Sequence, residues 1–137
     1  MLHFVAQNWY LFVALAVIVA LLVFPTARQL MLGVENVSPG QAIQIANHRS
    51  GLFIDVRQAD EFAAGHIPKA KNIPLEKLSG PSAELEKLKG KPVILYCQSG
   101  QRSMRAATLL RKQGIDSVYN LAGGFVHWQR ENLPAER

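Results

Sequence analysis

The chain has 137 residues and a net charge of +5; 49% of its residues are hydrophobic and 18% are charged. This length accommodates one globular domain and not two. The basic balance is mild and no run of lysines or arginines occurs, which argues against nucleic-acid binding and suits a small anionic substrate or an anionic lipid surface. The only cysteine, Cys97, excludes an intramolecular disulfide, and the scattered histidines lack the spacing of a metal site.

The first segment of the chain is strongly apolar. Every residue from Trp9 to Phe24 is apolar. Residues 4–24 would span roughly 30 Å as a helix, which matches the hydrocarbon core of a bilayer. We therefore predict one transmembrane helix within residues 1–27, followed by a juxtamembrane linker over residues 28–37.

Two other interpretations of this segment are weaker. A cleaved signal peptide would need a lysine or arginine before the apolar run and a small-residue cleavage site, and Phe24-Pro25-Thr26 is a poor one. A buried core helix would need one polar face, which this segment lacks.

Arg28 and further basic residues follow the apolar run, so the positive-inside bias places the C-terminal domain in the cytoplasm. A single reduced thiol agrees with that compartment.

Helix and strand signals alternate along the rest of the chain. This alternation predicts an α/β domain over residues 38–137, with a central, mostly parallel sheet flanked by helices. In such folds the reactive site lies beyond the carboxyl ends of the strands, and Cys97 directly follows a strand. The expected elements are a helix over 38–47, a strand over 52–56, a short helix over 60–65, a non-helical stretch between Pro68 and Pro74, a helix over 82–88, a strand over 93–96, a helix over 103–113, a strand over 118–120 and a helix over 125–131.

The loop that begins at Cys97 has three features of a reactive site. A thiol at a helix N-terminus meets the positive end of the helix dipole, which favours the thiolate. Gly100 permits a positive φ, so that neighbouring N–H groups can turn inward as an anion nest. Arg102 can bind an anion or attach the loop to a carboxylate. The sequence therefore predicts a thiolate nucleophile in a cradle of donors. The alternative is that Cys97 is an inert buried thiol and Arg102 a surface residue.

Three motifs follow one another along the chain: Asp55-Val56-Arg57 with Asp60-Glu61-Phe62, Gly65-His66-Ile67-Pro68, Ala70 and Asn72-Ile73-Pro74; the loop Cys97-x-x-Gly100-x-Arg102-Ser103; and Leu121-x-Gly123-Gly124-Phe125-x-x-Trp128. They resemble the motifs of the rhodanese family, and the resemblance covers roughly residues 36–133. The overall plan, a membrane helix followed by one such domain, is similar to bacterial membrane-anchored members with a single domain, which implies a single-pass protein of the inner membrane.

The resemblance implies a sulfurtransferase. Cys97 would take sulfane sulfur from a thiosulfate- or persulfide-type donor, hold it as a persulfide and pass it to cyanide, a small thiol or a protein acceptor, without a metal or organic cofactor. Related phosphatases and arsenate reductases have one more residue between cysteine and arginine than the four found here, so the loop length favours sulfur over a tetrahedral oxyanion. The residues implied to bind substrate through their backbone N–H groups are Gln98, Ser99, Gly100, Gln101, Arg102 and Ser103.

Two other functions compete with catalysis. A rhodanese fold can serve as a non-catalytic sulfur carrier or as a module that binds a membrane partner. A redox-sensing thiol is the other, although Cys97 has no second cysteine in the chain to resolve it.

Several residues around the loop are expected to support it. Asp55 ends a strand, and it either orients Arg102 and the loop amides or caps the following turn. Arg57 and Glu61 are i and i+4 neighbours if the short helix includes both, and they are then expected to form a structural ion pair, with substrate contact as the alternative. The side chains of Ser99 and Gln101 are candidates for substrate contact. Three further expectations concern packing: His66 in a packed turn and not as a proton shuttle, His127 on a helix surface, and Phe125 and Trp128 in the core, with a wall of the cleft as the alternative.

Overall fold

The structure of the protein is a computed structural model that describes residues 1–31 and 33–137, with only the backbone described for residues 25–31. The chain divides into two compact units, of which the first ends at Met31.

The first unit is made of two helices, α1 (Leu2–Gln7) and α2 (Trp9–Met31). The sequence predicted one helix, whereas the structure has a break at Asn8. Asn8 is the C-cap of α1, and its side chain donates to the Phe4 carbonyl at 2.9 Å. In the part of the chain that the structure describes, no helix is both long and apolar enough to cross a membrane. The predicted transmembrane helix thus has no support from the structure. The backbone of α2 continues through the start of the predicted linker, while the side chain of Arg28, on which the predicted orientation depends, lies outside the described residues.

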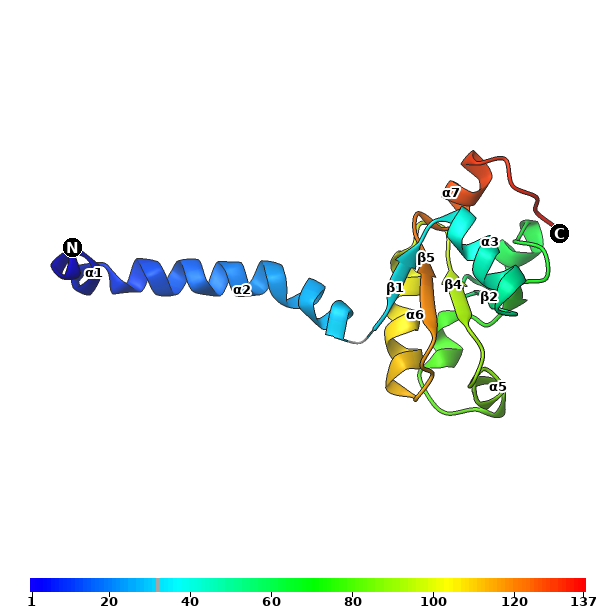
Figure 1. Ribbon diagram of the computed structural model, residues 1–137, viewed down its shortest axis with the longest axis horizontal. Coiled ribbons are helices and arrows are strands. Elements are labelled where there is room, and N and C mark those ends of the chain that lie inside the picture. Colours follow the sequence, from blue (N-terminus) through cyan, green and yellow to red (C-terminus); the bar gives the residue numbers. More distant parts are fainter. Residues whose placement is uncertain (32) are drawn as a thin grey trace. The chain divides into compact units, whose positions relative to one another are not determined.

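The second unit contains a five-stranded sheet in which every pairing is parallel (Figure 1). The α/β class with a parallel central sheet is therefore confirmed. The spatial order is β1-β5-β4-β2-β3, and the strands are β1 (Glu35–Val37), β2 (Leu52–Asp55), β3 (Lys71–Asn72), β4 (Val93–Tyr96) and β5 (Val118–Leu121).

The two edge strands were not predicted. β1 lies in the segment expected to be a linker, and β3 lies in the stretch between Pro68 and Pro74 that was expected only to be non-helical. Both strands are too short to show an alternation of apolar and polar residues, and each is recruited by pairing with a longer strand, β5 or β2.

The helix η1 was not predicted, and the other helices of this unit begin and end close to the predicted positions. Ser38 caps α3 by accepting a hydrogen bond from the Gln41 N–H, while the Gln41 side chain accepts from the Ser38 N–H, and Pro39 occupies the first turn. α5 is shorter than predicted. The helices are α3 (Pro39–His48), α4 (Ala59–Ala64), the 3₁₀ helix η1 (Leu75–Leu78), α5 (Ala83–Glu86), α6 (Gln101–Lys112) and α7 (Gly124–Arg130).

Each face of the sheet buries its own hydrophobic core. Val93 and Leu95 of β4 pack with residues of η1, α5 and α6, whereas Ile94 and Tyr96 pack with residues of α3 and α7. Figure 1 shows α6 on one side of the sheet and α3 on the other. Strand β4 is buried on both faces, which explains its uninterrupted apolar sequence, and it fixes Cys97 at the carboxyl end of the central strand.

Candidate active site

Cys97 lies between β4 and α6, with its side chain directed into the sheet face that α6 covers. The side chain is 1% exposed. The sulfur is nevertheless surrounded by donors. The Gly100 N–H donates to Sγ at 3.1 Å and the Ser103 N–H at 3.4 Å, and the Ser103 hydroxyl lies 3.4 Å away.

These contacts lower the pKa of Cys97. Burial opposes the thiolate, but the contact with the Ser103 hydroxyl and the hydrogen bonds from the backbone of Ser103, Gly100 and Ser99 outweigh it, so the pKa of Cys97 lies below its ordinary value. The side chain is buried, which agrees with the alternative of an inert thiol. The N–H groups of Gly100 and Ser103, however, point at the sulfur, which an inert thiol would not require.

The conformation of the loop depends on glycine at two places. Gly100 has φ +102° and precedes the first residue of α6, which lets its N–H turn toward the sulfur. Gly124 has φ +60°, and a Cβ atom there would lie 2.5 Å from the Cys97 carbonyl oxygen. The first N–H groups of α7 donate to the loop carbonyls, Phe125 to Cys97 at 2.8 Å and Val126 to Gln98 at 3.1 Å. The N-terminus of α7 therefore fixes the backbone of the loop at Cys97 and Gln98.

We predict that Gly124→Ala loosens the loop. The substitution combines a left-handed backbone with a clash against backbone atoms, so it should lower the free energy of unfolding by at least about 2 kcal/mol. Denaturant unfolding measures this loss. Gly40→Ala in α3 is the matched control, because a Cβ there meets nothing within 4 Å; it should be neutral or slightly stabilising. Equal effects of the two substitutions would contradict the close approach.

Arg102 is attached to a carboxylate. Its guanidinium donates to both carboxylate oxygens of Glu61, at 2.8 and 3.1 Å, and so ties the start of α6 to α4. The predicted ion pair between Arg57 and Glu61 is therefore wrong. Glu61 points from α4 toward the loop and meets Arg102, while Arg57 turns back toward the end of β2.

This ion pair predicts a pH dependence of stability. The hydrogen bond from Arg102 lowers the pKa of Glu61 from 4.5 to about 2. Since the folded-state pKa is depressed, the stabilisation is complete above pH 4.5 and is lost as the pH falls through about 2. Both side chains are about one third exposed, so solvent screening reduces the effect to about 1 kcal/mol.

Unfolding measured between about pH 2 and pH 5 tests this dependence. Glu61→Gln should remove it, whereas Glu84→Gln, which breaks a more exposed pair with Lys71, should leave it unchanged. A variant Glu61→Gln that loses stability over the same range as the unchanged chain would show that other carboxylates control it.

A buried ion pair holds the other side of the loop. Asp55 is 0% and Arg57 3% exposed, and the Arg57 guanidinium donates to both carboxylate oxygens of Asp55, with the shortest distance 2.7 Å. Burial disfavours the charged form of Arg57, but the hydrogen bond and charge of Asp55 outweigh it and raise the pKa of Arg57. Arg57 also donates to Gln98 Oε1 at 3.1 Å and to the Gly65 carbonyl at 2.7 Å.

One interpretation of the sequence placed Asp55 beside Arg102. In the structure Asp55 does not bind Arg102, which pairs with Glu61. It accepts a hydrogen bond from the Arg57 N–H at 2.9 Å, which is the predicted turn cap. Its influence on the loop passes through Arg57 to Gln98. The side chain of Asn72, to which the sequence assigned no role, donates to the carbonyls of Asp55 and Arg57, both at 3.0 Å, and fixes this turn.

The remaining supporting residues are structural. His66 is buried, its ring stacks on Phe62 and its Nδ1 lies 2.9 Å from the Phe62 carbonyl, as expected for a packed turn. Phe125 and Trp128 belong to the core between the sheet and α7, and Phe125 also lines a cavity, as the alternative proposed. His127 is half-buried, with Nδ1 3.0 Å from the Ala122 carbonyl. Among the described residues, no group of three or more histidine, cysteine or acidic side chains is placed to hold a metal ion.

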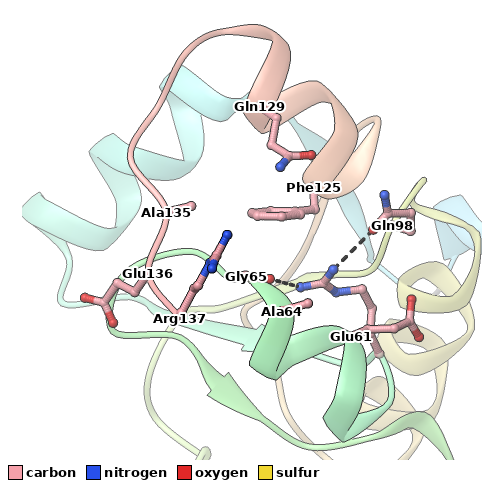
Figure 2. Close-up of a pocket in the computed structure, with 10 residues that line it drawn as sticks. Glu61, Ala64, Gly65, Gln98, Phe125, Gln129, Ala135, Glu136 and Arg137 are labelled. Carbon is pink, nitrogen blue, oxygen red and sulfur yellow. Dashed lines mark hydrogen bonds between the residues drawn. The ribbon is translucent and has the colours of Figure 1, made fainter.

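A cavity of about 540 Å³ opens beside the loop (Figure 2). Cys97 does not line it, but Gln98, the next residue, does. Figure 2 shows the ring of Phe125 and the side chains of Gln129 and Arg137 facing the cavity. Arg57 also lines it and donates to Gln98 and to the Gly65 carbonyl. The lining residues are Arg57, Glu61, Ala64, Gly65, Gln98, Phe125, Gln129, Ala135, Glu136 and Arg137.

The six loop residues expected to bind substrate have different surroundings. Gly100 and Ser103 face the sulfur, and the Ser99 backbone contributes to its charge state while its side chain is exposed. Gln98 and Arg102 use their side chains to fasten the loop to Arg57 and Glu61. The Gln101 side chain is exposed at the start of α6.

The fold and the site define a class of protein. Its members have a parallel α/β domain with a cysteine in a loop whose backbone N–H groups point at the sulfur. Comparison with protein families gives the same class: residues 38–131 match the rhodanese-like domain. The chain belongs to the rhodanese-like family.

Several relatives and one solved structure show how far the likeness extends. Protein YqhL of Bacillus subtilis is 49% identical over 61% of this chain, which corresponds to 64% of YqhL, less than two thirds of its length. Protein YibN of Escherichia coli is 36% identical over 99% of this chain and 96% of its own.

Two further relatives have names that state an activity. Thiosulfate sulfurtransferase GlpE of Shewanella oneidensis is 33% identical over 72% of this chain and 95% of its own. The structure of the human single-domain sulfurtransferase TSTD1 is similar with a TM-score of 0.61 and 30% identity, and covers 72% of this chain and 98% of its own. Sulfur transfer is therefore represented among the relatives of this chain.

Proposed function

We propose that this protein is a sulfurtransferase that carries sulfane sulfur on Cys97. The thiolate attacks the outer sulfur of a thiosulfate- or persulfide-type donor, the donor's S–S bond breaks, and sulfite or a thiolate leaves with the electron pair. An acceptor thiolate or cyanide then attacks the outer sulfur of the Cys97 persulfide and releases the Cys97 thiolate. The observation that carries this proposal is the pair of N–H groups, from Gly100 and Ser103, directed at a buried sulfur.

The surroundings of the sulfur favour each step. The lowered pKa of Cys97 favours the thiolate, and the N-terminus of α6 and the loop amides stabilise negative charge on the sulfur before and after transfer. We assign the acceptor to the cavity beside Gln98, because it adjoins the loop and its walls carry both charged and apolar groups.

Steady-state kinetics test the proposed mechanism. With thiosulfate as donor and cyanide as acceptor, the covalent intermediate predicts ping-pong behaviour, in which double-reciprocal plots at several cyanide concentrations are parallel. Intersecting lines would contradict a covalent sulfur intermediate. Formation of a persulfide without turnover on any acceptor would favour the alternative function, a sulfur carrier or a partner-binding module.

We also propose that the N-terminal unit attaches the domain to the inner membrane, with the domain on the cytoplasmic side. The supporting observation is the apolar sequence from Trp9 to Phe24, whose large side chains are exposed. In the described part of the chain no helix is long and apolar enough to cross a membrane. Extraction of membranes with carbonate buffer tests the proposed attachment. The full chain should stay with membranes in carbonate buffer, and a chain lacking residues 1–28 should not. Release of both would overturn the proposal.

A further inference from the structure

Hydrogen bonds between uncharged side chains lead from Cys97 to the edge of the sheet. The Ser103 hydroxyl, 3.4 Å from the sulfur, donates to Asn120 Oδ1 at 2.5 Å, and Asn120 Nδ2 donates to Asn36 Oδ1 at 2.9 Å. Asn120 is 4% exposed and Ser103 is fully buried. Asn36 and Asn120 are opposite each other in the pairing of β1 with β5, so two neighbouring strands and α6 together build this series of bonds.

The donors and acceptors in this series define where its protons are. The Oδ1 atom of Asn120 can only accept, and the Ser103 hydroxyl has a single proton to donate. The orientation of the Asn120 amide is fixed, because its Nδ2 also lies 3.4 Å from the Gly100 carbonyl. While the Ser103 proton points to Asn120, the Ser103 oxygen is free to accept from the S–H group of Cys97. In this arrangement the backbone N–H groups of Gly100 and Ser103 donate to the sulfur, and the Ser103 hydroxyl proton does not.

Ionisation of Cys97 changes this balance. The thiol proton leaves to solvent, and the sulfur then only accepts. To stabilise it, the Ser103 hydroxyl must turn from Asn120 to the sulfur, which leaves the buried Oδ1 of Asn120 without that donor. A buried acceptor that loses its donor costs free energy. Asn120 and the thiolate therefore compete for one proton.

We propose that Asn120, oriented by Asn36, is a positioning residue that keeps the proton of the Ser103 hydroxyl on its own Oδ1 and so limits how far that hydroxyl favours the Cys97 thiolate. Such a limit suits a sulfur carrier, because a thiolate that is stabilised too strongly becomes a poorer nucleophile. The inference deepens the proposed function and rests on it. Its test, however, measures ionisation of the sulfur and needs no sulfur transfer.

Charged groups near Cys97 are the other influence on its ionisation. Arg102 of α6 interacts with the sulfur and is paired with Glu61 of α4. Asp55 and Arg57 form their own pair at the end of β2. None of these side chains hydrogen-bonds to Ser103, Asn120 or Asn36 in the described structure, so substitutions in the polar series leave them in place.

The pH profile of alkylation by iodoacetamide in the full chain tests the proposal, and it reports on one site because Cys97 is the only cysteine. Asn120→Leu frees the Ser103 hydroxyl for the sulfur, so the midpoint should move to lower pH by about one unit. Ser103→Ala removes the donor and should move the midpoint to higher pH. Thr108→Val is the matched control, because this α6 hydroxyl donates to the Met104 carbonyl, and it should not move the midpoint.

Asn36→Ala provides a second variant that does not depend on a buried substitution. Asn36 is exposed, and its removal loosens the Asn120 amide, so the midpoint should move in the same direction as in Asn120→Leu but by less. An unchanged midpoint in both variants, or a move to higher pH, would overturn the inference. The expected midpoints in a protein that transfers no sulfur would instead count against the proposed function alone.

Discussion

Cys97→Ser is expected to abolish sulfur transfer, with a loss of at least about a thousandfold, while changing the free energy of unfolding by less than about 1 kcal/mol. The activity is lost because an alcohol at this position has neither the thiolate nor the ability to form a persulfide. Stability is kept because the hydroxyl is nearly isosteric and can accept from the same Gly100 and Ser103 N–H groups. Thiosulfate–cyanide assays and denaturant unfolding measure the two quantities.

The two measurements separate a chemical role of Cys97 from a structural one. Cys97 also packs in the core beneath α6, so a structural role would appear as a large loss of stability in Cys97→Ser. Residual transfer close to that of the unchanged chain would exclude Cys97 as the sulfur carrier.

Arg57→Met should destabilise the domain by about 3 to 5 kcal/mol, because it leaves the Asp55 carboxylate buried without its countercharge. It also removes the bonds from Arg57 to Gln98 and Gly65. Sulfur transfer should fall about tenfold or more, since the loop loses one of its attachments. Unfolding in denaturant and the kinetic assay, run at a temperature where the variant is folded, measure these effects.

A double variant identifies the cause of the lost stability. In Asp55→Leu/Arg57→Met no buried charge remains, so part of the stability should return while the activity stays low. Arg49→Met is the matched control: this more exposed arginine donates to the Tyr119 hydroxyl, and its loss should cost about 0.5 kcal/mol or less. If the double variant were less stable than Arg57→Met alone, the unpaired charge would not be the main cause.

The central part of the site was predictable because local sequence determines it. A strand of four apolar residues buried on both faces, a cysteine at its end and a glycine before the next helix are features that neighbouring residues impose on each other. The parallel sheet followed from the alternation of helices and strands.

The pairing of the charged residues was not predictable in the same way. Spacing along the chain placed Arg57 with Glu61, but the loop after β4 brings Arg102 to Glu61 from 41 positions away, and Arg57 turns back to Asp55. A contact at four residues is a rule for a continuous helix, and Arg57 lies before α4 begins.

The two asparagines that meet where the edge strand β1 pairs with β5 were also missed. Asn36 and Asn120 come together only when β1 pairs with β5, and β1 is too short to be recognised as a strand from its sequence. A polar residue within the otherwise apolar carboxyl end of β5 was the one available signal, and by itself it does not identify a partner.

The measurement closest to the central proposal is the intact mass of the full chain after incubation with thiosulfate and removal of the excess. The proposal predicts a gain of one sulfur atom, located on Cys97 by fragmentation, lost again on addition of cyanide, and absent in Cys97→Ser. A folded, unmodified Cys97 after the same treatment with thiosulfate and with a persulfide donor would contradict it.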